Sequence, residues 1–554
     1  MPLLTIDLQP KQFPPSRASF TSSQLLDTLG YFYSFSNEKI EQSPAGRSRP
    51  VYLRLYYGPP DQSPHDTAII IPEQSSVSPG DLLVALGDPN PDHHVQPAAG
   101  PGGRWFWTYD LIQAAFYLLS RQEELEVAER DALDRFSTEH SLLNRLGLIE
   151  RPVLNEAALI LDSVIQQVAA ERQIPLLRKS TWPHPCRYAV SLSHDVDDLG
   201  YRDPVFALRC LGQFVRTRRF HALRKGLGTL LQWGRNRLTG CDYARWYFDE
   251  WLRLEDEAGF RSTFYLVAAS DDKSSYDPNY DIAEPRLAAQ LRFMAKRGWE
   301  IGAHGSFDSY RSAQRICAER QRLQGVLGTP VDGIRQHYLR LALPDTWVHQ
   351  ELAGFRYDAT LGFRDRLGFR AGLTTPFTAY NLSADDPFSL LELPLTVMDT
   401  VLFQRQNLSP EAAFATVQDC ARRVQEVQGL LTVLWHQHVF EPVYRKFVLH
   451  LARESTVYVA PMTEVARWWQ ARQHLTLAAD AMTAHTRRLI LRASRAIPDR
   501  VCLDIGGAGW QLVQASTGDL IPRGRAGSRP LDAIVLPPMA QNQTVTLEFK
   551  PESD

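Results

Sequence analysis

A chain of 554 residues with 44% hydrophobic and 22% charged residues has an ordinary globular composition and is long enough for two to four domains. A formal net charge of −3 excludes a protein whose main task is to bind the nucleic-acid backbone, because that task needs a marked basic surplus. No apolar run approaches the roughly 20 residues that cross a bilayer, and no apolar core of signal-peptide length follows a basic head, so we expect a cytoplasmic protein.

The N-terminal part of the chain mixes β-like runs, at residues 51–57 and 68–71, with turn-rich stretches. Apolar residues then recur at helical spacing over residues 109–125, and a second helix is expected at residues 155–170. These patterns predict a small mixed α/β domain over residues 1–175.

Strand and helix patterns alternate over residues 183–470, which predicts a parallel sheet that is either open or closed into a barrel. The buried strands expected in this region lie at residues 188–193, 262–267, 300–304 and 430–436. The remaining residues, 476–554, contain alternating runs with many Gly and Pro, so we predict a small β-rich C-terminal appendage.

Residues 205–241 form a basic insertion with eight Lys and Arg residues, no acidic residue and interleaved apolar side chains. A basic amphipathic helix pair of this kind could lie on an anionic membrane surface or hold a phosphorylated carrier, such as a lipid-linked sugar. A solvated helical face that covers the mouth of the active site is an equally good interpretation. Both interpretations place the insertion near the candidate site, because it begins only a few residues after Asp198.

The apolar run at residues 188–193 ends abruptly in His194, Asp195 and Asp197. The carboxyl ends of strands are where α/β folds build their active sites. Two carboxylates one residue apart can divide the work of a metal-assisted hydrolase, since one binds the cation while the other takes a proton from the attacking water. An acidic helix cap would be the simpler interpretation of an isolated Asp-x-Asp, but further motifs follow downstream.

Two more expected strands each end in a histidine, His304 and His436. Between them, residues 333–340 carry two arginines and another histidine, which could also be a surface turn. Neutral imidazole and carboxylate suit zinc and similar divalent ions. The six cysteines are scattered without a Cys-x-x-Cys pair, so any metal would be held by His and Asp.

Taken in order, these motifs resemble the polysaccharide deacetylase domain of carbohydrate esterase family four, over roughly residues 183–470. Residues 110–155 resemble an uncharacterised N-terminal domain that precedes this module in some bacterial members. The resemblance implies a distorted (β/α) barrel and a metal-dependent hydrolase, with zinc as the expected metal, that removes N-acetyl groups from an amino sugar. We expect a role in bacterial surface-polysaccharide or glycolipid assembly on the cytoplasmic side, which the lack of an export signal and the basic insertion both suit.

The resemblance implies a role for each motif residue. Asp195 would be the general base, and Arg335 would orient it through a charge-assisted hydrogen bond. Asp197 would be a metal ligand. His436 would be the general acid, with Asp399 as its orienting partner.

The second motif departs from the family pattern His-x-x-x-His, because His304 is followed at that spacing by Asp308. Spacing alone favours Asp308 as the third ligand, which would make a harder site that favours zinc less strongly over manganese or iron. His337, which stands where the family usually carries a proline, is the alternative ligand. Arg340 is a further candidate for ligand or substrate binding.

Two rival functions remain open. The same fold could hydrolyse another carbon–nitrogen bond or an ester, because the motifs define the attacking machinery better than the group attacked. The altered second motif also leaves room for a catalytically silent carbohydrate-binding protein. The retention of Asp195, His304, Arg335 and His436 favours catalysis, since a binding module has no need of both a base and an acid.

Overall fold

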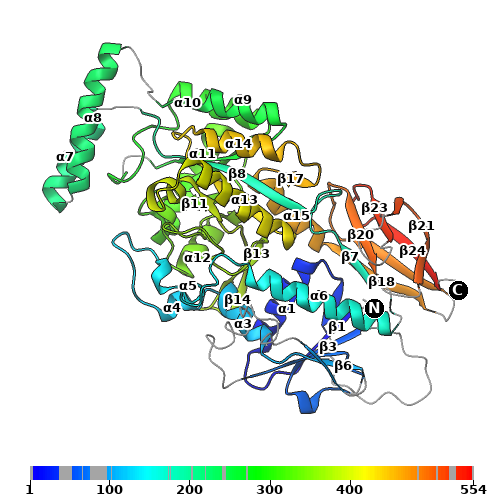
Figure 1. Cartoon of the computed structure of the whole chain (residues 1–554). Coiled ribbons are helices and arrows are strands. Elements are labelled where there is room, and N and C mark those ends of the chain that lie inside the picture. Colours follow the sequence, from blue (N-terminus) through cyan, green and yellow to red (C-terminus); the bar gives the residue numbers. More distant parts are fainter. Residues whose placement is uncertain are drawn as a thin grey trace.

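The structure is a computed structural model of the whole chain. It describes residues 4–35, 53–64, 66–74, 97–100, 103–172, 174, 176–200, 204–218, 220–239, 245–269, 273–482, 486–506, 510–522 and 532–551. The described strands form four sheets, of six, ten, four and four strands, and helices pack around the two larger ones (Figure 1).

The N-terminal sheet has the strand order β2-β1-β3-β4-β6-β5 and is parallel except for the last pair. Its strands are β1 (Leu4–Leu8), β2 (Tyr33–Phe35), β3 (Leu53–Gly58), β4 (Ile69–Pro72), β5 (Ala98–Gly100) and β6 (Arg104–Phe106). Its helices include α1 (Pro15–Leu29), α3 (Leu111–Leu119), α4 (Glu123–Glu126), α5 (Leu142–Arg145) and α6 (Val153–Glu171). The helix expected at residues 109–125 is split into α3 and α4, because Arg121 between them has a positive φ of 55°.

Helix α6 is the one described helix that is long and apolar enough to cross a membrane. However, 61% of its apolar window is buried inside the protein, which is typical of a core helix.

The central sheet has the order β13-β14-β12-β11-β10-β9-β8-β16-β15, with β17 paired to β8. Its strands are β8 (Tyr188–Val196), β9 (Thr263–Val267), β10 (Glu300–Gly305), β11 (Gly333–Gln336), β12 (Tyr357–Asp358), β13 (Phe377–Asn381), β14 (Asp386–Glu392), β15 (Val397–Met398), β16 (Leu430–Leu434) and β17 (Val457–Val459). All pairs are parallel except β13 with β14. Among the described strands the pairing follows an open path, so the sheet is the open one of the two arrangements expected from the sequence, and a full (β/α) barrel is not shown.

The strands predicted in this region correspond to β8, β9, β10 and β16. These strands are buried on both faces apart from the first residue of β10, because helices cover the sheet. The covering helices are α9 (Phe248–Ala258), α10 (Pro285–Lys296), α11 (Ala313–Leu327), α12 (Asp345–Leu352), α13 (Pro410–Glu426), α14 (Pro442–Leu451) and α15 (Met462–Gln473).

The C-terminal region consists of two four-stranded sheets. The first contains β18 (Leu475–Met482), β19 (Arg487–Ala493), β24 (Thr544–Pro551) and β21 (Trp510–Ala515). The second contains β22 (Asp519–Pro522), β23 (Asp532–Leu536), β20 (Val501–Gly506) and β7 (Leu176–Lys179). Strand β7 comes from the short segment between the first two predicted domains, so the C-terminal region is completed from far upstream.

The three predicted regions share their hydrophobic cores. One cluster joins Leu154 of the N-terminal region to Leu361 and Phe377 of the central region. Another joins Trp468 of α15 to Leu503 of β20. The N- and C-terminal regions are therefore packed into the central unit rather than linked to it as separate modules.

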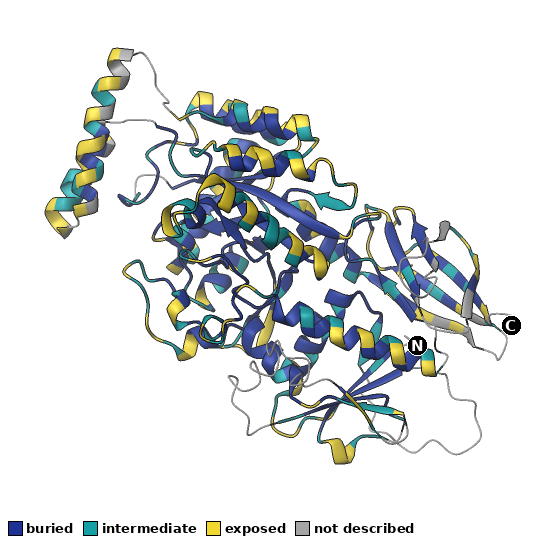
Figure 2. Ribbon diagram, in the orientation of Figure 1, coloured by how far each residue is buried: buried dark blue, intermediate teal, exposed yellow. Residues whose placement is uncertain are grey.

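The basic insertion forms a helical hairpin of α7 (Pro204–Thr217) and α8 (Phe220–Thr239), and its residues 219, 240 and 241 lie outside the described part. The two helices extend away from the body of the protein (Figure 1). They carry many exposed positions along their length (Figure 2). Much of the hairpin surface is therefore exposed, although Ala207, Cys210, Ala222 and Thr229 are buried.

Candidate active site

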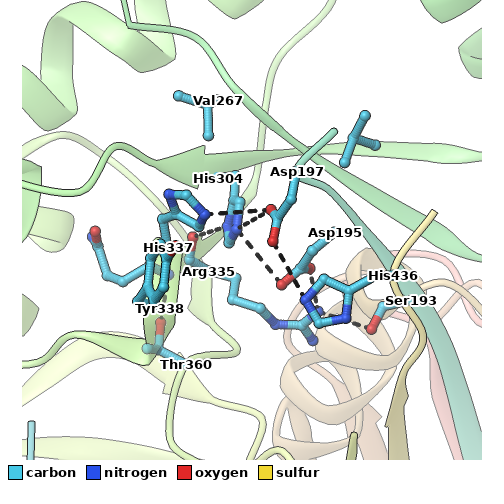
Figure 3. Close-up of polar contacts among 12 residues, drawn as sticks. Ser193, Asp195, Asp197, Val267, His304, Arg335, His337, Tyr338, Thr360 and His436 are labelled. Atoms are coloured by element: carbon cyan, nitrogen blue, oxygen red, sulfur yellow. Dashed lines mark hydrogen bonds and ion pairs between the residues drawn. The ribbon is translucent and has the colours of Figure 1, made fainter. Parts of the chain in front are cut away.

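Polar side chains from several segments meet at the carboxyl edge of the central sheet (Figure 3). Strands β16, β8, β9, β10 and β11 are consecutive neighbours and run parallel, so their carboxyl ends share one edge. The side chains brought together there are Asp195, Asp197, His304, Arg335, His337 and His436.

Among the described residues, Asp197, His304 and His337 form the group that could hold a metal ion, with ligand atoms within 4.8 Å of one another. The Nε2 atom of His304 lies 3.3 Å from Asp197 Oδ1, and that of His337 lies 3.5 Å from the same oxygen. The three imidazoles near Asp197 hold the pKa of its carboxyl well below the usual range, although burial acts to raise it.

The hydrogen bonding of His304 tests whether a cation fits. Its Nδ1 atom lies 2.8 Å from the carbonyl oxygen of Arg335, which can only accept, so Nδ1 carries the hydrogen. Nε2 therefore presents a lone pair to Asp197 Oδ1, another acceptor, and both atoms are buried without a hydrogen-bond partner. Two acceptors facing each other without a donor are what a divalent cation satisfies, so the residues fit a metal.

His337 is held from its other side by Asp277, whose Oδ1 atom lies 3.5 Å from His337 Nδ1. Asp277 also accepts backbone hydrogen bonds from Phe307 (2.7 Å) and Ser274 (2.7 Å), which fix its carboxylate. Burial acts to lower the pKa of His337, but the charges of Asp197 and Asp277 outweigh it and raise the pKa to about 9.

Asp308, the ligand favoured by spacing, is not part of this cluster. Its side chain is 53% exposed and forms an ion pair with Arg340 Nη1 at 3.1 Å. Arg340 itself binds structural groups: it donates to the carbonyl oxygen of Leu133 at 2.9 Å and to the hydroxyl of Tyr310 at 2.8 Å. The structure therefore brings the alternative ligand, His337, to Asp197 and His304, and directs Asp308 and Arg340 elsewhere.

Asp195 is buried and anchored by Arg335, whose Nη1 atom donates to Asp195 Oδ1 at 2.8 Å and to Ser193 Oγ at 2.9 Å. A third bond, from Arg335 Nε to the carbonyl oxygen of Ala359, fixes the guanidinium plane. The other oxygen of Asp195, Oδ2, lies 3.6 Å from His304 Nε2 and so borders the metal cluster.

His436 is anchored by Asp399 in the same way. Its Nδ1 atom lies 2.6 Å from Asp399 Oδ1, and its backbone N–H donates to Asp399 Oδ2 at 2.9 Å. The Nε2 atom of His436 points to Asp197 Oδ2 at 3.4 Å. Burial acts to lower the pKa of His436, but Asp399 and Asp197 raise it well above its usual value.

A pocket of about 560 Å³ opens over these side chains. Tyr276 and Tyr338 form part of its wall, with their rings edge to face at 5.7 Å. Helix α8 contributes Lys225 and Thr229. The sequence did not reveal Asp277, because its Asp-Pro-Asn run is an ordinary turn signal. Tyr338 lies within residues 333–340, the segment with two arginines and a histidine.

Sequence comparison matches residues 74–170 to a family of unknown function, DUF7033. This match fits the uncharacterised N-terminal domain expected from the sequence. No curated protein matches the chain.

Comparison with solved structures gives matches of low similarity, several of them to deacetylases. A protein assigned as a polysaccharide deacetylase from Mycobacterium smegmatis is 20% identical, with a TM-score of 0.36 over 55% of this chain and 96% of that chain. A mutant of the peptidoglycan deacetylase PdaC from Bacillus subtilis is 10% identical (TM-score 0.24; 52% and 93% covered). A CE4 family pseudoenzyme from Bacillus anthracis is 10% identical (TM-score 0.26; 51% and 66% covered).

Proposed function

We propose that the protein is a metal-dependent hydrolase that removes the N-acetyl group from an amino sugar in a polysaccharide, oligosaccharide or glycolipid. The observation that carries the proposal is the pair of facing acceptors, His304 Nε2 and Asp197 Oδ1, in a pocket that also presents an anchored carboxylate and an anchored imidazole. Asp197, His304 and His337 would hold the metal. Two imidazoles and one carboxylate are a ligand set that suits zinc.

The protein's own groups fit the two proton transfers of amide hydrolysis. Arg335 occupies Asp195 Oδ1, so Oδ2 is the oxygen that takes a proton from the attacking water. Asp399 occupies His436 Nδ1, so Nε2 is the atom that gives a proton to the departing amine. A bound divalent ion would polarise the acetyl carbonyl and acidify the water. The products are acetate and a free amino sugar.

The test measures the metal content of the purified protein and the release of acetate from N-acetylglucosamine oligomers, before and after chelation. Asp195→Asn should keep the metal and lose at least about 100-fold in turnover, because it removes the base but no ligand. His304→Ala and His337→Ala should lose the metal, whereas Asp308→Ala should keep it.

Other outcomes separate the rival functions. An active Asp195→Asn variant would show that the base is misassigned. Bound metal without acetate release would favour another carbon–nitrogen or ester substrate. A native protein that binds sugar but no metal would favour a silent carbohydrate-binding protein.

We further propose that the α7–α8 hairpin docks on an anionic membrane surface, which suits a cytoplasmic enzyme that acts on lipid-linked sugars. Large apolar side chains are exposed along the hairpin, including Phe220 (76%), Leu231 (78%) and Leu238 (90%). Exposed arginines accompany them, at positions 209, 216, 218, 224 and 235, and residues 204–239 contain no acidic residue. Exposed apolar surface with exclusively basic charge is complementary to anionic lipid.

Sedimentation with vesicles tests this docking. The protein should bind vesicles rich in phosphatidylglycerol and not vesicles of phosphatidylcholine, and Phe220→Ser with Leu231→Ser should weaken binding at least tenfold through lost apolar burial. Phe293→Ser, which removes an exposed ring from α10, is the matched control. Equal binding to vesicles of both lipids would contradict membrane docking. A Phe220→Ser, Leu231→Ser protein that changes its oligomeric state but binds vesicles like the native protein would also contradict it.

A further inference from the structure

Three arginines gather on the wall of the active-site pocket. Arg135 comes from the N-terminal region, Arg364 from the loop after β12, and Arg405 from a short π-helical turn (Val401–Arg405). Burial lowers the pKa of Arg135, and the positive charges of Arg364 and Arg405 act in the same direction, against the hydrogen bond and charge of Asp131. Three segments that are distant in sequence thus place like charges close together in one pocket.

These arginines have too few carboxylate partners. Asp131 Oδ2 lies 2.8 Å from Arg135 Nη2 and 3.3 Å from Arg364 Nε, so one carboxylate serves two guanidinium groups. Arg405 makes no ion pair with any residue that the structure describes. Three cations against one anion leave an excess of two positive charges.

Two other cationic side chains on the pocket wall, Arg245 and Lys225, bind oxygen atoms of nearby residues. Arg245 forms an ion pair with Asp198 at 2.7 Å. Lys225 donates to the backbone carbonyl of Asp277 at 2.8 Å. The unbalanced positive charge is therefore concentrated at the arginine cluster rather than spread around the pocket.

The cluster adjoins the candidate metal site. Arg135 Nη1 donates to the carbonyl oxygen of Tyr338 at 3.1 Å, and Tyr338 directly follows the candidate ligand His337. Tyr338 holds a left-handed backbone conformation, with φ of 62°, that a tyrosine rarely adopts. Because Arg135 and Tyr338 are bonded neighbours in the pocket wall, one ligand can contact the arginines and the aromatic side chains together.

Arg135 is held in place by the central unit. The loop that carries it is tied down at three points: Arg340 donates to the carbonyl of Leu133 (2.9 Å), Arg311 pairs with Asp134 (2.6 Å), and Thr138 donates to Asp365 (2.6 Å). This loop lies within the segment that matches a family of unknown function. The N-terminal region thus supplies a fixed cation to the pocket wall.

We propose that Arg135, Arg364 and Arg405 bind an anionic group on the sugar substrate, a phosphate or a carboxylate, and that the N-terminal region serves to complete this subsite. Guanidinium groups recognise both oxyanions through paired, charge-assisted hydrogen bonds. The inference rests on the proposed function for the identity of the substrate as an amino sugar, but the anion subsite itself is tested by binding alone.

Calorimetric binding to the full-length protein tests the subsite. The probes are N-acetylglucosamine 1-phosphate, an N-acetylated hexosaminuronic acid, neutral N-acetylglucosamine and inorganic phosphate. The protein should bind at least one anionic sugar about tenfold or more tightly than the neutral sugar, and the stronger of the two identifies the oxyanion. Arg405→Gln and Arg364→Gln should each reduce this preference severalfold, while Arg366→Gln, an exposed neighbour bonded to Asn144, should keep it.

Equal binding of anionic and neutral sugars would overturn the proposal, as would a preference that Arg364→Gln and Arg405→Gln leave unchanged. Arg405 makes no ion pair with a described residue, so its variant avoids the risk of misfolding that buried Arg135 carries. An anionic preference without release of acetate would support the subsite and contradict the deacetylase. Release of acetate without an anionic preference would support the deacetylase and contradict the subsite.

Discussion

Each imidazole of the candidate site is oriented by a polar group behind it. The carbonyl of Arg335 holds His304, Asp277 holds His337, and Asp399 holds His436. Such outer partners fix the tautomer and the direction of the ring, and they tune its basicity. The supporting residues therefore decide how well the side chains beside the metal perform.

Asp277→Asn should weaken metal binding about 10- to 100-fold, because His337 loses the charge that supports its ring. Competition with a chelator of known affinity measures the change. Asp308→Asn removes a carboxylate close in sequence to His304 but outside the cluster, so it should bind metal like the native protein. Equal affinities in Asp277→Asn and the native protein would show that His337 is not a ligand.

The Asp277→Asn substitution also affects the loop around residue 277. Asp277 also accepts the backbone N–H groups of Ser274 and Phe307, and its substitution could loosen this loop. Thermal unfolding of the metal-free Asp277→Asn protein, compared with the metal-free native protein, separates loss of the loop from loss of the ligand.

At the scale of the elements, the central sheet contains a buried pair of acids. Asp358 of β12 and Glu392 of β14 are register partners, and both are fully buried. Burial raises the pKa of Asp358 to about 6, and burial together with the charge of Asp358 raises that of Glu392 well above its usual value. The folded sheet therefore retains protons that the unfolded chain releases.

This pair should make stability fall as the pH rises. A carboxyl whose pKa is raised by folding stabilises the protein below its unfolded pKa, near 4, and that contribution is lost as the pH rises through 6 and above. Asp358→Asn removes one of the two acids. The free energy of unfolding of the variant minus that of the native protein is measured in denaturant at both pH values. This difference should be about 1–3 kcal/mol more favourable at pH 8 than at pH 5.

The control for this measurement is Asp308→Asn, which alters an exposed carboxylate of the same unit. Its stability difference from the native protein should be nearly the same at both pH values. An Asp358→Asn difference that is also constant with pH would contradict the raised pKa values of this pair.

For the whole molecule, the parts that could be predicted are those encoded locally. Apolar runs mark β8, β10 and β16, and the polar residues that follow each run are read directly from the sequence. Alternation of strands and helices implies parallel strands, whose carboxyl ends meet at one edge. These two facts are enough to bring Asp195, His304 and His436 to one place.

Contacts that depend on long-range packing could not be predicted. The spacing argument for Asp308 requires its side chain to face His304, but a 3₁₀ turn (Ser309–Arg311) follows, and Arg340 from after β11 draws the carboxylate away. Likewise, no local pattern places Arg135 in the pocket. Both positions depend on segments that meet only in the folded protein.

Strand β7 has a consequence for how such a protein can change in evolution. It is only four residues long, yet it pairs with β20 across more than 300 positions of the chain. Replacing the middle of the protein with the corresponding segment of a homologue would have to preserve this distant pairing and the core that joins Trp468 to Leu503. The flanking regions and the catalytic unit are therefore expected to be inherited together, as a single cooperative fold rather than as interchangeable modules.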